Sequence, residues 1–170
     1  RGEYINKIIK KEIKVPASKV CIIGPGGSGK SQLAFKAIHQ YEKEGLFDLV
    51  VPVYFSDVSS MSFSDFLWNI AKSLFDIKDI QVFEKLDIES RKKSIQNFLS
   101  QRRKHPLLFL DNYETVSYII NDKIKNITAI VEQYDEAVKI SNFINNDLPS
   151  NTSVLVTSRE KNNNFGLLIV

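Results

Sequence analysis

Eight residues, GPGGSGKS at positions 24–31, constrain the fold of this chain more than any other segment. They hold four of the chain's seven glycines and follow the apolar run KVCIIG, which reads as a short buried strand. A turn needs one or two glycines, so four indicate a backbone that something approaches too closely for side chains to fit. Apolar residues then recur at the spacing of an amphipathic helix, at Leu33, Ala34, Ala37, Ile38 and Tyr41.

The segment also fits the pattern G-x-x-x-x-G-K-[ST], and its place between a strand and a helix is typical of a phosphate-binding loop. Glycines adopt positive φ angles and leave successive N–H groups open to phosphate oxygens, and the helix start adds further free N–H groups. We expect Lys30 to contact the β- and γ-phosphates and Ser31 to ligate Mg²⁺. The alternative is a glycine-rich turn that precedes Lys-Ser by chance. The expected nucleotide-contacting residues of the loop are Gly24, Pro25, Gly26, Gly27, Ser28, Gly29, Lys30, Ser31 and Gln32.

An acidic residue that could complete a magnesium site ends the next strongly apolar run, LLFLDN, at Asp111. Ligands of open parallel sheets bind at the carboxyl ends of the strands, where this aspartate would lie. Asp111 is therefore expected to hold Mg²⁺ directly or through water. The alternative is an aspartate that ends a strand and caps the following helix.

Two further charged residues have catalytic and structural interpretations. Glu114, three residues beyond Asp111, can orient or deprotonate an attacking water, or it can complement a helix dipole from the first turn. Arg159 follows the apolar run TSVLVTS and can sense a γ-phosphate, or it can pair at the surface with a neighbouring glutamate. The sequence alone does not distinguish between these interpretations.

Strand-like and helix-like segments alternate along the chain, which predicts an α/β fold around a mostly parallel sheet. Pro16 ends a first helix expected at 3–14, Gly45 ends the helix after the loop, and Ser64 opens another. The stretch 76–88 is expected to be a loop. The expected strands are 19–24, 49–55, 106–112, 152–159 and the final LLIV, and the other expected helices are 91–103 and a helix–loop–helix at 114–146. The proline within 49–55 indicates an edge strand.

Composition limits the class of protein. The 170 residues suit one domain, and a net charge of +3 does not by itself indicate a nucleic-acid or membrane partner. The basic runs at 91–93 and 102–104 share a predicted helix with apolar residues, so a solvated helix face is favoured over nucleic-acid binding. A single cysteine, Cys21, suits a reducing compartment and predicts a cytoplasmic protein. The chain begins without methionine and ends in FGLLIV, so we expect a fragment of a longer multidomain protein.

The segments GPGGSGKS, LLFLDNYETV and LPSNTSVLVTSRE, in this order, resemble the nucleotide-binding domain of the STAND class of P-loop NTPases, which includes NB-ARC and NACHT proteins. The resemblance covers nearly all of residues 1–170. It implies a three-layer sandwich with strand order 5-1-4-3-2, bound ATP or ADP with Mg²⁺, and Arg1 of RGEYINKI beside the nucleotide. It also implies a lid, a winged-helix region and sensor regions elsewhere in the protein, and a homo-oligomer in the ATP state.

The function that this resemblance implies is a signalling switch that hydrolyses ATP slowly. Many relatives carry a second acidic residue directly after the strand aspartate, where this chain has Asn112, and that difference argues against fast hydrolysis unless Glu114 substitutes. Two alternatives remain: an ordinary ATPase motor or phosphotransferase with fast turnover, and a binding module with a vestigial nucleotide site. Nothing in the residues themselves distinguishes adenine from guanine.

Overall fold

The computed structural model describes residues 11, 13, 16–55, 61–101, 105–121, 128–161 and 165–169. Arg1, most of the helix expected at 3–14 and the basic run at 102–104 lie outside these residues. Of the expected first helix, residues 11 and 13 are described and are helical.

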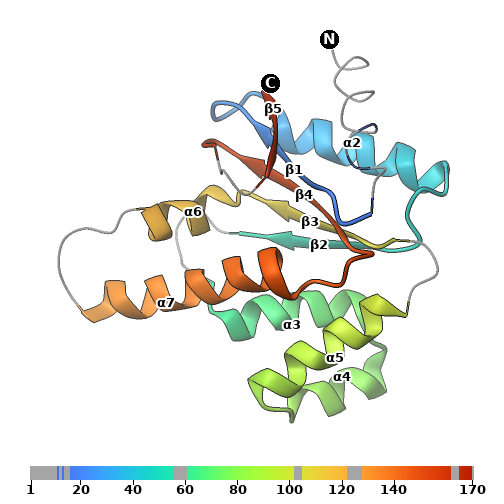
Figure 1. The fold of residues 1–170 in the computed structure, drawn as a ribbon, viewed down its shortest axis with the longest axis vertical. Coiled ribbons are helices and arrows are strands. Elements are labelled where there is room, and N and C mark those ends of the chain that lie inside the picture. The colour runs from blue at the N-terminus through green and yellow to red at the C-terminus, as the bar shows by residue number, and fades with distance from the viewer. Residues whose placement is uncertain are drawn as a thin grey trace.

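A five-stranded sheet forms the centre of the domain (Figure 1). Its strands lie in the order β2-β3-β4-β1-β5, and every described pairing is parallel. This confirms the expected 5-1-4-3-2 order, and Pro52 lies on an edge strand as its lost N–H donor requires. The strands are β1 (Lys19–Ile23), β2 (Val50–Tyr54), β3 (Leu107–Asp111), β4 (Ser153–Ser158) and β5 (Gly166–Ile169).

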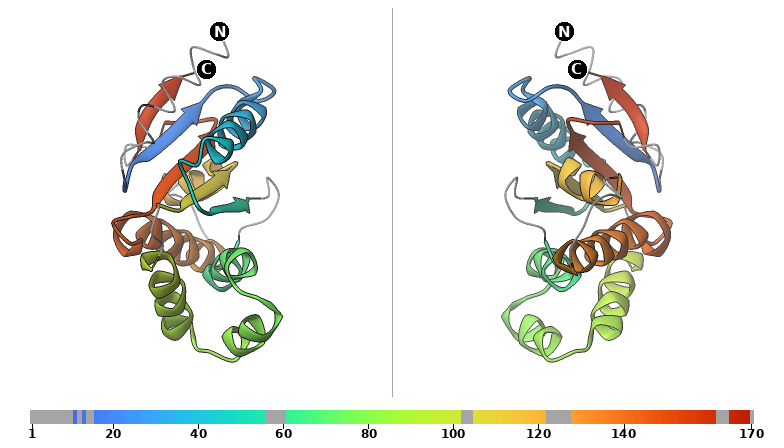
Figure 2. Two further views of the ribbon diagram at one scale, coloured as in Figure 1. Left: turned by 90° about the vertical axis from the view of Figure 1, so that its right-hand side faces the viewer. Right: turned by 90° about the vertical axis from the view of Figure 1, so that its left-hand side faces the viewer.

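Helices cover both faces of the sheet and give the expected three layers (Figures 1 and 2). One face packs against α2 (Lys30–Lys43), and the other packs against α3 (Phe63–Leu74), α5 (Ile88–Ser100) and α7 (Thr128–Asn142). Successive strand residues point to opposite faces, so Leu107 and Phe109 join the α2 side whereas Leu108 and Leu110 join the other.

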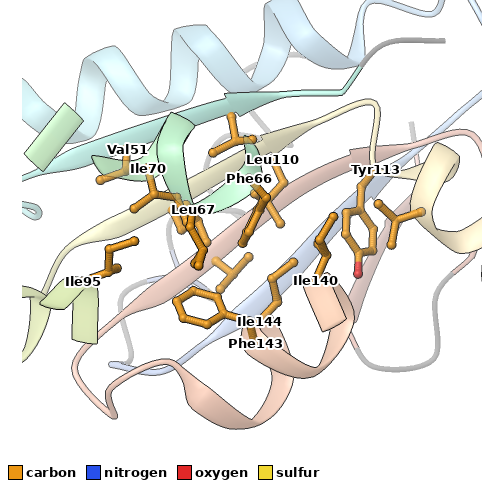
Figure 3. Close-up of a cluster of buried hydrophobic side chains, with 14 of the residues drawn as sticks. Val51, Phe66, Leu67, Ile70, Ile95, Leu110, Tyr113, Ile140, Phe143 and Ile144 are labelled. Atoms are coloured by element: carbon orange, nitrogen blue, oxygen red, sulfur yellow. The ribbon is translucent and has the colours of Figure 1, made fainter. Parts of the chain in front are cut away.

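The larger of the two cores lies between the sheet and α3, α5 and α7 (Figure 3). Aromatic rings fill much of it: Phe66 stacks on Phe55 and Phe63 and meets the edge of Phe143. Phe143 opens η1 (Phe143–Asp147), a single π-helical turn that follows α7 directly. Phe63 and Phe66 of α3 are therefore core residues, as their spacing indicated, and Trp68 packs against this core while partly buried.

Three local expectations differ from the structure. The stretch expected as a loop at 76–88 contains α4 (Ile77–Glu84), which is capped by the Asp76 side chain and lies beyond α3 from the sheet. The cap of α3 is Ser62 rather than Ser64, because the Ser62 hydroxyl accepts the Asp65 N–H and donates to the Asp65 carboxylate. The expected helix at 91–103 begins earlier, at Ile88, behind the Asp87 cap.

The basic run at 91–93 is largely engaged within the domain. Arg91 donates to the Ser64 hydroxyl and lies over the Phe83 ring, and Lys92 pairs with Glu89 and Asp147. Arg91 and Lys92 therefore pack against neighbouring residues of the domain and do not form the solvated helix face that the sequence favoured. None of the described helices is long and apolar enough to cross a membrane.

The order of the strands brings three chain segments to one edge of the sheet. Ile23 at the end of β1 lies beside Ser158 at the end of β4, and Leu110 of β3 lies beside Val156 of β4. The residues that follow β1, β3 and β4 therefore meet at the carboxyl edge, with β4 in the middle.

Candidate phosphate-binding site

The loop between β1 and α2 requires glycine for its backbone conformation. Gly27 and Gly29 have φ angles of 76° and 83°, a region that other residues seldom adopt. A Cβ added at either position would meet no atom within 4 Å, so the requirement is conformational rather than steric. Between them, Ser28 donates its N–H to the Pro25 carbonyl at 3.2 Å and closes a tight turn.

The start of α2 differs from the starts of α3, α4 and α5. Ser62, Asp76 and Asp87 each place a side-chain oxygen on the first N–H groups of their helices. The N-cap of α2 is Gly29, which has no side chain, and the first turn contains no acidic residue. The first amides of α2 and its positive dipole end therefore remain available to an anion.

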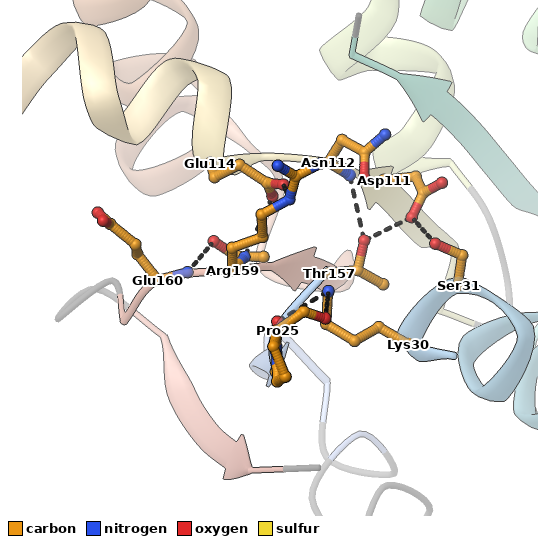
Figure 4. Close-up of polar contacts among 11 residues, drawn as sticks. Pro25, Lys30, Ser31, Asp111, Asn112, Glu114, Thr157, Arg159 and Glu160 are labelled. Carbon is orange, nitrogen blue, oxygen red and sulfur yellow. Dashed lines mark hydrogen bonds and ion pairs between the residues drawn. The ribbon is translucent and has the colours of Figure 1, made fainter. Parts of the chain in front are cut away.

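Lys30 folds back over the loop. Its Nζ donates to the carbonyls of Gly24 at 2.8 Å and Pro25 at 2.9 Å, and the residue is 7% exposed. The ammonium group thus lies inside the curve of the loop rather than in solvent (Figure 4). A phosphate in the loop would offer this cation stronger, charged acceptors in place of the two carbonyls.

Ser31 and Asp111 meet across the carboxyl edge, as the sequence predicted for a shared site. The Ser31 hydroxyl donates to Asp111 Oδ1 at 2.7 Å, and the Thr157 hydroxyl donates to the same oxygen at 2.5 Å. Donating its proton leaves the lone pairs of Ser31 Oγ for a cation, and the two hydroxyls leave Asp111 Oδ2 untouched. Hard oxygen donors beside a phosphate loop suit Mg²⁺, so these residues fit the metal that the fold implies.

Glu114 and Arg159 form an ion pair beside the loop. Glu114 begins α6 (Glu114–Asn121) and is 3% exposed; its Oε1 lies 3.0 Å from Arg159 Nε, and its Oε2 accepts the Arg159 N–H at 3.3 Å. The Arg159 side chain is 46% exposed, and its Nε lies 3.9 Å from where a Cβ of Gly26 would be. Arg159 therefore reaches the loop while holding the buried carboxylate (Figure 4).

The charge of Glu114 also affects its neighbours in the core. Burial and, to a smaller extent, the Glu114 carboxylate together raise the pKa of the Cys21 thiol to about 12. Cys21 is 0% exposed in the middle of β1, so it is the inert core thiol that its sequence context predicted.

Asn112 adopts a left-handed conformation directly after β3, with φ at 59°. Asparagine tolerates this region better than most residues do. Its N–H donates to the Thr157 hydroxyl at 3.1 Å, so this turn is fixed to β4. The conformation gives a physical reason for asparagine at this position.

The structure thus brings together the loop, Asp111, Glu114 and Arg159 at one edge of the sheet (Figure 4). Arg1 lies outside the described residues. Thr157 has no distinct signal in the sequence, although it lies at the centre of the contacts around Asp111. Its signal, a threonine at the end of a buried strand, is equally typical of ordinary β-structure.

A parallel sheet with this strand order, a glycine loop between β1 and α2 and an aspartate at the end of β3 define a P-loop NTPase domain. The profile of the NB-ARC domain family matches residues 2–139. The chain belongs to the NB-ARC domain family, and the glycine loop at 24–31 lies within the matched region.

Several solved structures share the fold. The chain is similar to the Aeropyrum pernix ORC1 protein in complex with DNA, with a TM-score of 0.59 and 15% identity over 98% of this chain and 44% of that one. It is similar to Drosophila ORC bound to DNA, with a TM-score of 0.59 and 12% identity over 99% and 40%. It is also similar to the Aeropyrum pernix ORC2 protein in ADPNP–ADP complexes, with a TM-score of 0.55 and 17% identity over 99% and 46%.

At these identities the likeness concerns the fold. The chain spans less than half the length of each of these three structures. A comparison with curated protein sequences gives no match.

Proposed function

We propose that this domain binds ATP and ADP with Mg²⁺ in the loop between β1 and α2, hydrolyses ATP slowly, and acts as the nucleotide-dependent switch of a signalling protein. The observation that carries the proposal is the 2.7 Å contact between Ser31 Oγ and Asp111 Oδ1, which joins the loop to the end of β3 across 80 residues. Family membership supports nucleotide binding, and adenine is inferred from the STAND class.

Each proposed role rests on a contact that the chain makes. The left-handed glycines and the uncapped start of α2 present N–H donors to phosphate oxygens, and Lys30 supplies a cation within the loop. Ser31 and Asp111 would hold Mg²⁺, which when bound supplies positive charge that offsets the charge on the β- and γ-phosphate oxygens. The site residues act by binding and orienting the nucleotide.

Slow hydrolysis is supported by the position of the only carboxylate proposed to orient water. Glu114 is 3% exposed and is engaged by both the side chain and the N–H of Arg159. For Glu114 to orient water, the Arg159 side chain would have to leave the Glu114 carboxylate and contact another anion, such as a γ-phosphate. Asn112 supplies no carboxylate at the position where many relatives have one. Both features favour a protein that holds its nucleotide for long periods.

In this proposal, ADP keeps the protein closed, and exchange for ATP permits assembly with further copies. A lid, a winged-helix region and sensor regions of the same protein would complete the nucleotide site and respond to it. The rival functions, a fast ATPase or phosphotransferase and a module with a vestigial site, predict different nucleotide contents and rates.

The experiment is to denature the purified domain and identify any released nucleotide by chromatography, then to follow MgATP turnover in the refilled protein. Retained ADP and turnover slower than nucleotide exchange would support the switch. Rapid multiple turnover would favour an ordinary ATPase, a guanine nucleotide would overturn the choice of adenine, and failure to bind any nucleotide would favour the vestigial site.

A further inference from the structure

Thr157 contacts each of the three residues that follow one another at the end of β3. Its hydroxyl donates to Asp111 Oδ1 at 2.5 Å, the same hydroxyl accepts the Asn112 N–H at 3.1 Å, and its carbonyl accepts the Tyr113 N–H at 3.0 Å. Thr157 is 0% exposed and lies at the carboxyl end of β4. Thr157 and Ser31 thus approach the Asp111 carboxylate from opposite sides (Figure 4).

The hydrogen bonds determine the direction of the hydroxyl. A threonine hydroxyl has one proton, and a backbone N–H can only donate. Because Thr157 Oγ1 accepts the Asn112 N–H, its own proton is free to point at the Asp111 carboxylate. Asp111 Oδ1 therefore accepts hydrogen bonds from two hydroxyl groups, that of Ser31 in α2 and that of Thr157 in β4.

We propose that Thr157 is a positioning residue for the magnesium site, because its hydroxyl fixes the orientation of the Asp111 carboxylate relative to Ser31. This proposal rests on the proposed function, which assigns Mg²⁺ to Ser31 and Asp111. In this role the hydroxyl acts through Asp111 and not by contact with the nucleotide. Groups that orient metal ligands in this way typically change metal affinity by about 10- to 100-fold when they are removed.

Replacing the hydroxyl with a methyl group removes both its donation to Asp111 and its acceptance of the Asn112 N–H, and it changes little else. Thr157→Val keeps the shape of the side chain, and the main-chain bond from Tyr113 to the residue 157 carbonyl remains. Thr157→Ser keeps the hydroxyl and removes only the methyl group. Thr152 is the matched control: it is also buried, at 2% exposure, but its hydroxyl has no hydrogen-bond partner among the described residues.

The test is the affinity of the 170-residue chain for the non-hydrolysable ATP analogue AMP-PNP, measured by calorimetry in EDTA and again with Mg²⁺. The readout is the dissociation constant in EDTA divided by the dissociation constant in Mg²⁺, a ratio that isolates the contribution of the metal. Thr157→Val is expected to lower this ratio about 10- to 100-fold while leaving the affinity in EDTA close to the wild-type value. Thr157→Ser is expected to restore the ratio, and Thr152→Val to leave it unchanged.

Each other outcome overturns the proposal. A wild-type ratio in Thr157→Val would show that the hydroxyl does not position Asp111. An equal loss of affinity in EDTA and in Mg²⁺ would show that Thr157 acts through the fold alone, and failure of Thr157→Ser to restore the ratio would assign the effect to the methyl group. If Mg²⁺ has no effect on the wild-type protein, the assignment of Mg²⁺ to Ser31 and Asp111 fails first, and the role of Thr157 fails with it.

Discussion

Replacing Arg159 with alanine removes the cation that lies against the buried Glu114 carboxylate, and we expect the domain to lose stability as a result. Glu114 is 3% exposed, and its Oε1 lies 3.0 Å from Arg159 Nε. A carboxylate removed from water and deprived of a charged partner is costly because little solvent can replace the lost contact.

The expected loss in the free energy of unfolding lies between the losses found for buried and for exposed ion pairs. Breaking a fully buried pair costs about 3–5 kcal/mol, whereas exposed pairs contribute about 0–1 kcal/mol. The Arg159 side chain is 46% exposed, and the N–H of residue 159 still reaches Glu114 Oε2 in the variant. We therefore expect Arg159→Ala to lower the free energy of unfolding by about 1–3 kcal/mol. For a domain of this size, each kcal/mol lowers Tm by about 2–4 °C.

The assay is urea unfolding followed by circular dichroism, in EDTA and without added nucleotide, because bound ligand would itself add stability. Glu114→Gln and the double variant complete a double-mutant cycle. Since Glu114→Gln removes the charge that Arg159 balances, the loss caused by Arg159→Ala should be smaller in that background by about 0.5–3 kcal/mol. Lys161→Ala, a nearby exposed residue, is the control for removing a positive charge.

The reasoning would be refuted if Arg159→Ala cost no more than Lys161→Ala. It would also fail if the two changes at the pair were additive. In either case Arg159 would not be holding the Glu114 carboxylate, and the support that this pair gives to slow hydrolysis would disappear.

Two further predictions concern Asn112 and Cys21. Asn112→Ala is expected to destabilise the domain by about 1 kcal/mol, and Asn112→Gly to cost less, because φ is 59° there; equal urea midpoints for the two variants would contradict this. Burial and then the Glu114 carboxylate raise the pKa of Cys21 from 9.0 to about 12. The thiol therefore holds its proton more tightly in the folded state than in the unfolded state. Its contribution to the free energy of unfolding is fully present below pH 9 and is lost as the pH rises toward about 12, because the unfolded state ionises first. Urea unfolding between about pH 8 and pH 10 should show a steeper decline for the wild type than for Cys21→Ala, and parallel declines would refute it.

The parts of the fold that the sequence predicted are those with strong local signals. The first four strands along the chain, β1 to β4, are rich in apolar residues, and α2 follows a motif whose loop conformation depends on glycine. The helix α4 was missed because its short sequence, IKDIQVFE, has no consistent apolar face: Ile77 and Val82 are 78% and 62% exposed, whereas Phe83 is buried. Its Asp76 cap was visible in the sequence, but a cap without periodicity does not predict a helix.

The candidate site was predictable to the level of its motifs. The sequence placed Ser31 and Asp111 at one edge because both follow buried strands of a parallel sheet. It did not predict that Arg159 would lie against Glu114 or that Thr157 would bridge Asp111 and Asn112. These pairings depend on the register between β3 and β4, which is set by tertiary packing rather than by local sequence.

The central claim is that the loop between β1 and α2 binds nucleotide phosphates, and its most direct test is the affinity of Lys30→Ala for MgADP and MgATP by calorimetry. Lys36→Ala, an exposed lysine on the same helix, is the control. Loss of a charged hydrogen bond to phosphate should weaken binding by about 10- to 100-fold in Lys30→Ala and leave Lys36→Ala unchanged. Wild-type affinity in a folded Lys30→Ala protein would contradict the claim.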